Sequence, residues 1–242
     1  MSAHIIAATN FTQHLQQNPY PGRGFVVGRS ATEVAWLIVY WITGRSTRSQ
    51  NRRLVADGAT LRTEPVDAQQ LADPSLIIYE AMLELPGQYL FGNGEQVRAL
   101  YTAIQAGGNF DAALAPWAQE PDAPNYTPRI SGLLDLRTPP GCLTLSILKS
   151  NPANPEATDR FTYRPALPPA GLGVGLTTYR GDGEPLPSFA GEPLLLPCRG
   201  RAEEVLQAYW HALDTRNRIA IAVKRIPVDG SRSAIIIHNR FA

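Results

Sequence analysis

The chain has 242 residues, of which 44% are hydrophobic and 18% are charged, a composition typical of a soluble globular protein with a sizeable core. Its 22 basic and 21 acidic residues leave a net charge of +1, which argues against a general nucleic-acid or membrane-surface binder but allows a local basic pocket. The longest apolar run, at 34–42, is too short to cross a bilayer as a helix, and the first 22 residues lack a signal-peptide pattern. We therefore expect a cytoplasmic protein with no nucleic-acid or membrane partner.

The first 22 residues are mostly polar and end in prolines and a glycine, so we interpret 1–19 as an extension before a single domain over 20–242. β-Branched and aromatic runs between turn residues then predict strands at 23–29, 34–42, 53–57, 59–64, 76–84 and 87–91. Helical spacing follows over 92–108, with Asn93 as the expected N-cap, and a second short helix is expected near 109–118.

After a proline-rich loop at 116–129, strands are predicted at 129–136, 140–149, 159–164 and 172–180. The region 165–199 is rich in proline and glycine and is expected to be largely irregular. A helix at 201–215 and strands at 217–226 and 233–238 complete the chain. Because helices do not separate the strands one by one, the order favours an α+β domain of two stacked antiparallel sheets with helices packed outside.

The stretch NPYPGRGFVVGRS at 18–30 places Arg23 and Arg29 at the two ends of a predicted strand. Both would lie on one face, with Cα atoms about 20 Å apart if the strand stays straight. The two could share one small anion only if the chain bends, and Gly24 and Gly28 are where it could. The plainer interpretation is two strand-end arginines that point to water.

The densest polar cluster is TGRSTRSQNRR at 43–53, which contains Arg45, Arg48, Arg52 and Arg53 among hydroxyl and amide side chains. Guanidinium groups, hydroxyls and loop amides together suit a phosphate, because they offer charge-assisted hydrogen bonds in a fixed geometry. A solvated hairpin loop that happens to be basic is the alternative.

The loop at 116–129 delivers Arg129 to the start of a strand, with Glu120 and Asp122 upstream. An acid and an arginine on one constrained loop can serve as proton acceptor and charge stabiliser, and a loop salt bridge is the alternative. Tyr79 is either a core strand residue or a hydroxyl facing a site. Cys142, Cys198 and the scattered histidines form no disulfide framework or metal cluster, so we expect no metal and no cofactor.

Five segments in order resemble the archaeal-type IMP cyclohydrolase family over about residues 20–135. They are YPGRGFVVGRS (20–30), GRSTRSQNR (44–52), DPSLIIYEAM (73–82), FGNGEQ (91–96) and NYTPRISG (125–132). The later half is similar only loosely. The resemblance implies a four-layer αββα sandwich like that of Ntn hydrolases, and a cofactor-free enzyme that closes the ring of 5-formamidoimidazole-4-carboxamide ribotide to give IMP and water. An N-terminal Ser2 nucleophile, known in such folds, is disfavoured because some twenty residues separate it from the first core strand.

The family implies a purine ribotide as partner, and we also expect a homo-oligomer. On this resemblance the expected substrate-binding residues are Arg23, Arg45, Arg52 and Asn93, with Arg29 as a further candidate. The residues expected to carry the chemistry are Tyr79, Arg129 and one acid, Glu120 or Asp122. Two alternatives remain open: an enzyme of the same fold that acts on another nucleotide or amide, and a nucleotide-binding protein without catalytic activity.

Overall fold

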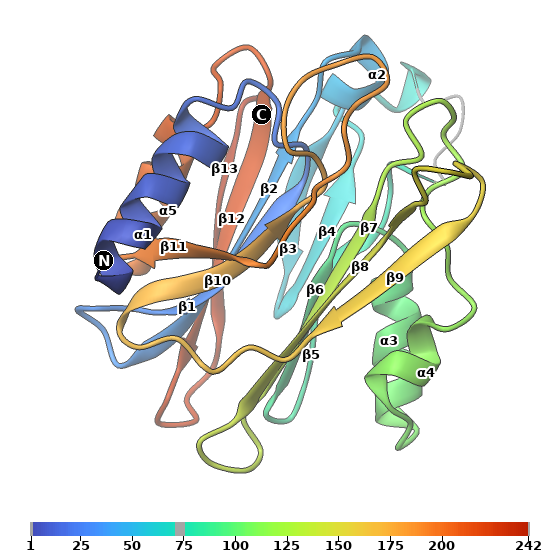
Figure 1. The fold of residues 1–242 in the computed structure, drawn as a ribbon. Coiled ribbons are helices and arrows are strands. Elements are labelled where there is room, and N and C mark those ends of the chain that lie inside the picture. Colours follow the sequence, from blue (N-terminus) through green and yellow to red (C-terminus); the bar gives the residue numbers. More distant parts are fainter. Residues whose placement is uncertain (1, 71–75, 242) are drawn as a thin grey trace.

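Two antiparallel sheets form the centre of the computed structural model, which describes residues 2–70 and 76–241 (Figure 1). The first sheet has the order β11 (Leu194–Cys198), β10 (Gly171–Thr177), β1 (Gly24–Arg29), β2 (Ala35–Thr43), β12 (Arg218–Pro227) and β13 (Ala234–Asn239). The second sheet has the order β3 (Arg53–Asp57), β4 (Thr60–Glu64), β5 (Glu80–Leu85), β6 (Gln88–Gly92), β7 (Arg129–Asp135), β8 (Cys142–Ser150) and β9 (Thr158–Tyr163).

Helices lie on the outer sides of both sheets (Figure 1). On the first sheet, α1 (Ala3–Phe11) contacts β11, and α5 (Ala202–Ala212) contacts β12 and β13. On the second sheet, α3 (Gln96–Gln105) packs on β5, β6 and β7 and also contacts α4 (Phe110–Leu114). The predicted class, a mixed α+β protein with two antiparallel sheets, is therefore confirmed. No helix in the described part of the chain is long and apolar enough to span a membrane.

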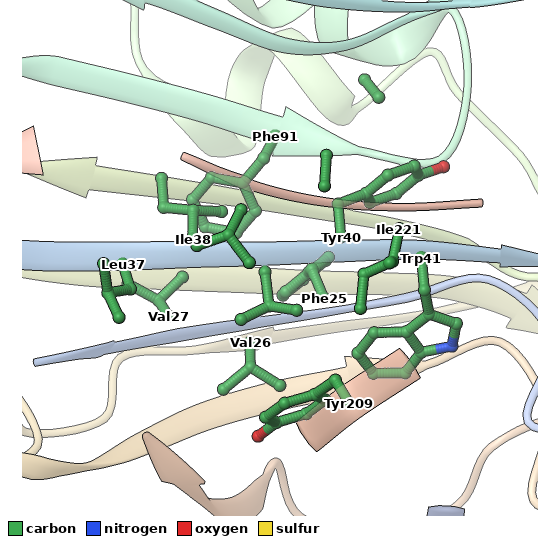
Figure 2. Close-up of a cluster of buried hydrophobic side chains, with 14 of the residues drawn as sticks. Phe25, Val26, Val27, Leu37, Ile38, Tyr40, Trp41, Phe91, Tyr209 and Ile221 are labelled. Carbon is green, nitrogen blue, oxygen red and sulfur yellow. The ribbon is translucent and has the colours of Figure 1, made fainter. Parts of the chain in front are cut away.

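The core is built around β2, in which every residue is buried because both faces of this central strand are covered. Successive side chains of a strand point to opposite faces. Tyr40 accordingly lies on the side of the second sheet, whereas Trp41 packs beside Tyr209 of α5 at a ring distance of 6.0 Å (Figure 2). Phe25 of β1 meets Phe91 of β6 edge to face at 4.8 Å, which joins the two sheets across the core.

The structure differs from the sequence prediction in the segment before residue 20. No helix or strand was predicted for 1–19, whereas α1 and a following helical turn (Thr12–Gln16) occupy this segment, and Leu15 is fully buried in the core. Ser2 is the N-cap of α1, since its hydroxyl accepts a hydrogen bond from the Ile5 amide. The helix lacks a clean apolar face, because Ile5 and Ile6 point to solvent, and periodicity therefore gave no signal.

Three further elements went unpredicted, the shortest of which is a 3₁₀ turn at Ala68–Gln70. β11 lies inside the region expected to be irregular, and its proline is tolerated because β11 is an edge strand of its sheet. A four-residue helix, α2 (Thr47–Gln50), forms within the basic cluster, where a solvated loop was the alternative to a phosphate site. The strand predicted at 76–84 begins as β5 at Glu80, and residues 73–75 of the third resembling segment lie outside the described residues.

A buried lysine ties the first sheet to the second. Lys224 of β12 is fully buried, and its ammonium lies 2.5 Å from a carboxylate oxygen of Glu84 on β5 and donates to the Ala59 carbonyl at 2.7 Å. Burial lowers the pKa of Lys224, and the Glu84 carboxylate opposes that shift.

The lowered pKa of Lys224 predicts an alkaline pH dependence of stability. Between the lowered pKa in the folded protein and the ordinary pKa of about 10.4 in the unfolded chain, the unfolded state binds more protons, so the free energy of unfolding rises with pH. We expect the Lys224→Met variant to lack this contribution, whose slope is at most about 1.4 kcal/mol per pH unit. Urea unfolding of both proteins across alkaline pH measures the difference, and identical slopes would contradict the assignment.

Candidate functional site

A cavity of about 590 Å³ opens at the end of the first sheet where β1 begins and β2 ends. Its walls come from segments that are far apart in sequence, namely residues in 20–23, 43–52, 76–77, 120–127 and 179–186. Four arginines and three acids are among them, which makes the cavity strongly polar. The sequence-predicted residues that line it are Arg23, Arg45, Arg52, Glu120 and Asp122.

The floor of the cavity holds a buried ion pair. Arg23, 7% exposed, donates to Glu120 Oε2 at 2.7 Å and to the Asn93 carbonyl at 2.8 Å. Glu120 is 3% exposed, and its other oxygen, Oε1, has no hydrogen-bond partner in the described part of the chain. Burial raises the pKa of the Glu120 carboxyl against the opposing attraction of Arg23. Since buried oxygens are normally paired, Oε1 is suited to receive a ligand's hydrogen-bond donor or a proton.

A second buried guanidinium lacks a carboxylate partner. Arg52 is 6% exposed and turns inward, where it donates to the backbone carbonyls of Ser49 at 2.8 Å and Thr43 at 3.1 Å. Across residues 2–70 and 76–241 it forms no ion pair with an acid, and burial lowers its pKa, as does nearby Arg23. An uncompensated buried charge is costly, so this part of the cavity favours an anion.

The mouth of the cavity is also basic. The Arg45 guanidinium lies 5.0 Å from the centre of the Tyr20 ring and forms an ion pair with Asp182. Arg48 lines the same region. Arg45 precedes α2 and Arg48 lies within it, and the start of α2 is fixed by reciprocal hydrogen bonds between Ser46 and Ser49. Arg53, the remaining arginine of the basic cluster, pairs with Glu64 instead and is not among the lining residues.

On the other wall, three lining side chains form a hydrogen-bonded chain. Asp122 accepts from the Thr127 amide at 2.6 Å and from the Thr127 hydroxyl, and that hydroxyl also meets the Tyr179 hydroxyl at 2.5 Å. The Tyr179 ring stacks on Tyr20, with 5.9 Å between ring centres. Asp122 therefore contacts Thr127 rather than Arg23 or Arg129.

Three predicted site residues lie behind the cavity and are not among its lining residues. Tyr79 packs its ring 6.0 Å from the Arg23 guanidinium carbon, and its hydroxyl lies 2.7 Å from that of Tyr40. Arg129 donates to Gln96 and lies over the Trp117 ring. Asn93 is not the N-cap expected for α3, because its side chain binds the Pro128 carbonyl and the Ile130 amide and so holds β6 and β7 in place.

The structure does not bring Arg29 to this cavity. β1 runs straight through its pairing with β2, so Arg23 and Arg29 lie at opposite ends of the strand. Arg29 instead packs over Trp36, 5.5 Å from the ring centre, beside a separate cavity of about 680 Å³. A shared ligand for the two arginines is therefore ruled out.

The residues of the site and its support that sequence reasoning missed include Tyr20, Tyr40, Thr127 and Tyr179. Thr127 stands two positions before Arg129 in the resembling segment NYTPRISG, so its hydroxyl could have been noticed. Tyr20 opens the first resembling segment. Tyr40 carries no distinguishing pattern within an apolar run, and Tyr179 lies within the proline- and glycine-rich region 165–199.

Comparison with known proteins gives a family for the chain. No curated protein matches its sequence significantly. A family profile described as "IMP cyclohydrolase-like protein" matches residues 20–230, a range that contains every segment lining the cavity. This match bears out the resemblance and extends it into the later half: the chain belongs to the IMP cyclohydrolase-like protein family.

Proposed function

We propose that the protein is an IMP cyclohydrolase, which closes the ring of 5-formamidoimidazole-4-carboxamide ribotide to give IMP and water. The family match supports this assignment, and the observation that carries it at the site is the unpartnered Glu120 oxygen beside Arg23. We further propose that the two sheets and their outer helices form the four-layer αββα sandwich of the Ntn-hydrolase-like type.

The proposed reaction needs one group that moves protons. The carboxamide nitrogen attacks the formyl carbon and transfers one proton to Glu120 Oε1, which delivers it to the developing oxyanion of the carbinolamine. The hydroxyl then leaves as water with the proton of the formamido nitrogen, and a carbon–nitrogen double bond forms. Because attack is intramolecular, positioning and electrostatics are the protein's main contributions. Arg23 orients Glu120 and adds positive charge near the oxyanion.

The other predicted residues take supporting roles in this proposal. Arg52, a buried cation without an acid partner in the described chain, attracts the anionic substrate, and Arg45 and Arg48 at the mouth bind the 5′-phosphate. Tyr79 and Arg129, which lie behind the cavity, act on Arg23 and Glu120 electrostatically rather than by touching the substrate.

The direct test is a spectrophotometric assay of the purified protein with the formamido ribotide, with and without a chelator. IMP formation at the same rate in both supports the proposal. Without turnover, calorimetric titration with IMP follows. Tight binding of IMP without turnover would indicate a nucleotide-binding protein without catalytic activity. Absence of both turnover and IMP binding would also rule out a nucleotide as the ligand of this cavity.

Arg45 provides a test of the phosphate position. We expect Arg45→Ala to raise KM for the ribotide by about 10- to 100-fold with little change in kcat, because a charge-assisted hydrogen bond contributes about 1.5–3 kcal/mol. Inhibition by inosine, which lacks the phosphate, should change little, whereas inhibition by IMP should weaken with the same factor. Asp182→Asn is the matched control: it releases Arg45 from its ion pair and should leave KM equal or lower. If Arg45→Ala weakens inhibition by inosine and by IMP equally, Arg45 does not bind the phosphate.

A further inference from the structure

The Asp122–Thr127–Tyr179 chain has a defined hydrogen-bond direction. Asp122 accepts on both carboxylate oxygens, one from the Thr127 amide and one from the Thr127 hydroxyl. A threonine hydroxyl has a single proton, and here that proton is directed to Asp122. The Thr127 oxygen can therefore only accept from Tyr179, which makes the Tyr179 hydroxyl the donor of their 2.5 Å hydrogen bond.

This direction determines what Tyr179 offers to a ligand. Burial raises the pKa of the Tyr179 phenol, so its proton is retained at neutral pH and is engaged with Thr127. In the described part of the chain the Tyr179 oxygen has no second partner, and its remaining hydrogen-bonding capacity is that of an acceptor. This wall of the cavity therefore offers the Tyr179 oxygen as a hydrogen-bond acceptor, and the floor offers Glu120 Oε1.

The backbone around Tyr179 holds its ring in place. Its amide donates to the Pro21 carbonyl at 3.1 Å, and its ring packs so closely on Gly22 that a Cβ there would come within 2.5 Å of it. Gly22 has a φ of +72°, which a residue with a side chain rarely adopts. The oxygen therefore lies at a fixed position next to the segment that carries Arg23.

We propose that Tyr179 is a specificity-determining residue of this cavity, held by Asp122 through Thr127 as an acceptor for a hydrogen-bond donor of the ligand. The class of group recognised is an amide or hydroxyl. That the donor belongs to a purine ribotide, through its carboxamide, its formamido N–H or a ribose hydroxyl, rests on the proposed function. Asp122 is then a positioning residue that acts through Tyr179 and does not itself exchange a proton with the substrate.

An isosteric substitution reverses the chain. In Asp122→Asn the Thr127 amide keeps the side-chain oxygen as its acceptor, so the new amide group faces the Thr127 hydroxyl and donates to it. The Thr127 proton must then turn to Tyr179, and the Tyr179 proton turns toward the cavity. A hydrogen-bond donor of the ligand would then face the Tyr179 hydroxyl proton and not a free acceptor, while the shape of the wall is unchanged.

The reversal is measured without any ligand by Raman spectroscopy. The intensity ratio of the tyrosine Fermi doublet distinguishes a phenol that donates from one that accepts. Subtracting the spectrum of a matched Tyr179→Phe protein isolates Tyr179 among the 9 tyrosines, both in the wild type and in Asp122→Asn. We expect a donor ratio for the wild type and a shift toward acceptor for Asp122→Asn. An unchanged ratio would overturn the proposal, whether or not the protein turns over the ribotide.

Steady-state kinetics test the consequence for specificity. We expect Asp122→Asn to raise KM for the ribotide roughly 10- to 100-fold, because a donor is left unpaired, and to raise it more than Tyr179→Phe does. The double variant should match Tyr179→Phe alone. If the effects of the two substitutions on KM add in the double variant, Asp122 acts independently of Tyr179 and the proposal is overturned. Absence of turnover and of IMP binding in the wild type would instead count against the proposed function, and the Raman result would still decide the direction of the chain.

Discussion

We expect Glu120→Gln to lower kcat for the proposed ring closure by about 100- to 10,000-fold, the range that loss of a general base typically costs. Glutamine retains the shape of the side chain and can still accept from Arg23 through its carbonyl oxygen, so IMP should bind within a few-fold of its wild-type affinity. What is lost is the ability of Oε1 to take and return a proton. Stopped-flow or steady-state measurement of IMP formation, with calorimetric titration of IMP, separates the two effects.

The control for this variant is Glu192→Gln, which removes an exposed acid that does not line the cavity and should leave kcat unchanged. The pH profile gives a second check. Because the base must be ionised, kcat/KM of the wild type should fall as pH falls through the pKa of Glu120, which burial raises above its ordinary value. If Glu120→Gln keeps the wild-type kcat, or if its kcat/KM still falls at low pH as in the wild type, another group carries the proton transfer.

Arg23→Met has the largest expected effect on stability. It removes the partner of a buried carboxylate and the hydrogen bond to the Asn93 carbonyl. Breaking a buried ion pair from one side typically costs about 3–5 kcal/mol, because the remaining charge stays out of water. Urea unfolding at neutral pH should show a loss of this size in the free energy of unfolding relative to the wild type.

The pH dependence and a second substitution identify the cause of that loss. Without Arg23, the pKa of Glu120 in the folded state should rise further, so the folded protein binds a proton that the unfolded chain has released. The stability of Arg23→Met should therefore increase as pH falls toward the ordinary pKa of a glutamate. Arg23→Met with Glu120→Gln should recover part of the loss at neutral pH. A double variant as unstable as the sum of the single variants would locate the cost in packing rather than in charge.

The sheets were predictable because strand patterns depend on local chemistry. The apolar and β-branched runs at β1, β2, β7 and β12 identified the strands, since a buried strand needs such residues along its whole length. The misses have local causes as well. α1 buries Ala7 on a helix whose isoleucines remain exposed, with Leu15 buried in the turn that follows, and β11 contains a proline that only an edge strand accepts.

The site could be predicted only in part, because residue type does not fix the direction of a side chain. Arginine-rich loops indicated an anion site, and Arg23, Arg45 and Arg52 do line one cavity. Arg29 has the same pattern in sequence, yet the length of a straight strand takes it to another cavity. Choosing between Glu120 and Asp122 required the contacts themselves: the one pairs with Arg23, the other with Thr127.

The position of Arg23 makes the site sensitive to shear between the sheets. Arg23 directly precedes β1 of the first sheet, while Asn93 follows β6 of the second sheet and Glu120 lies on the loop that leads to β7. The hydrogen bonds of Arg23 join groups from the two sheets. A relative displacement of the sheets by about 1 Å is enough to break them, and this is less than the displacement that lets water into the core. Activity should therefore be lost at lower denaturant concentrations than those that expose the two buried tryptophans of β2, because the active arrangement tolerates less displacement than the folded core does.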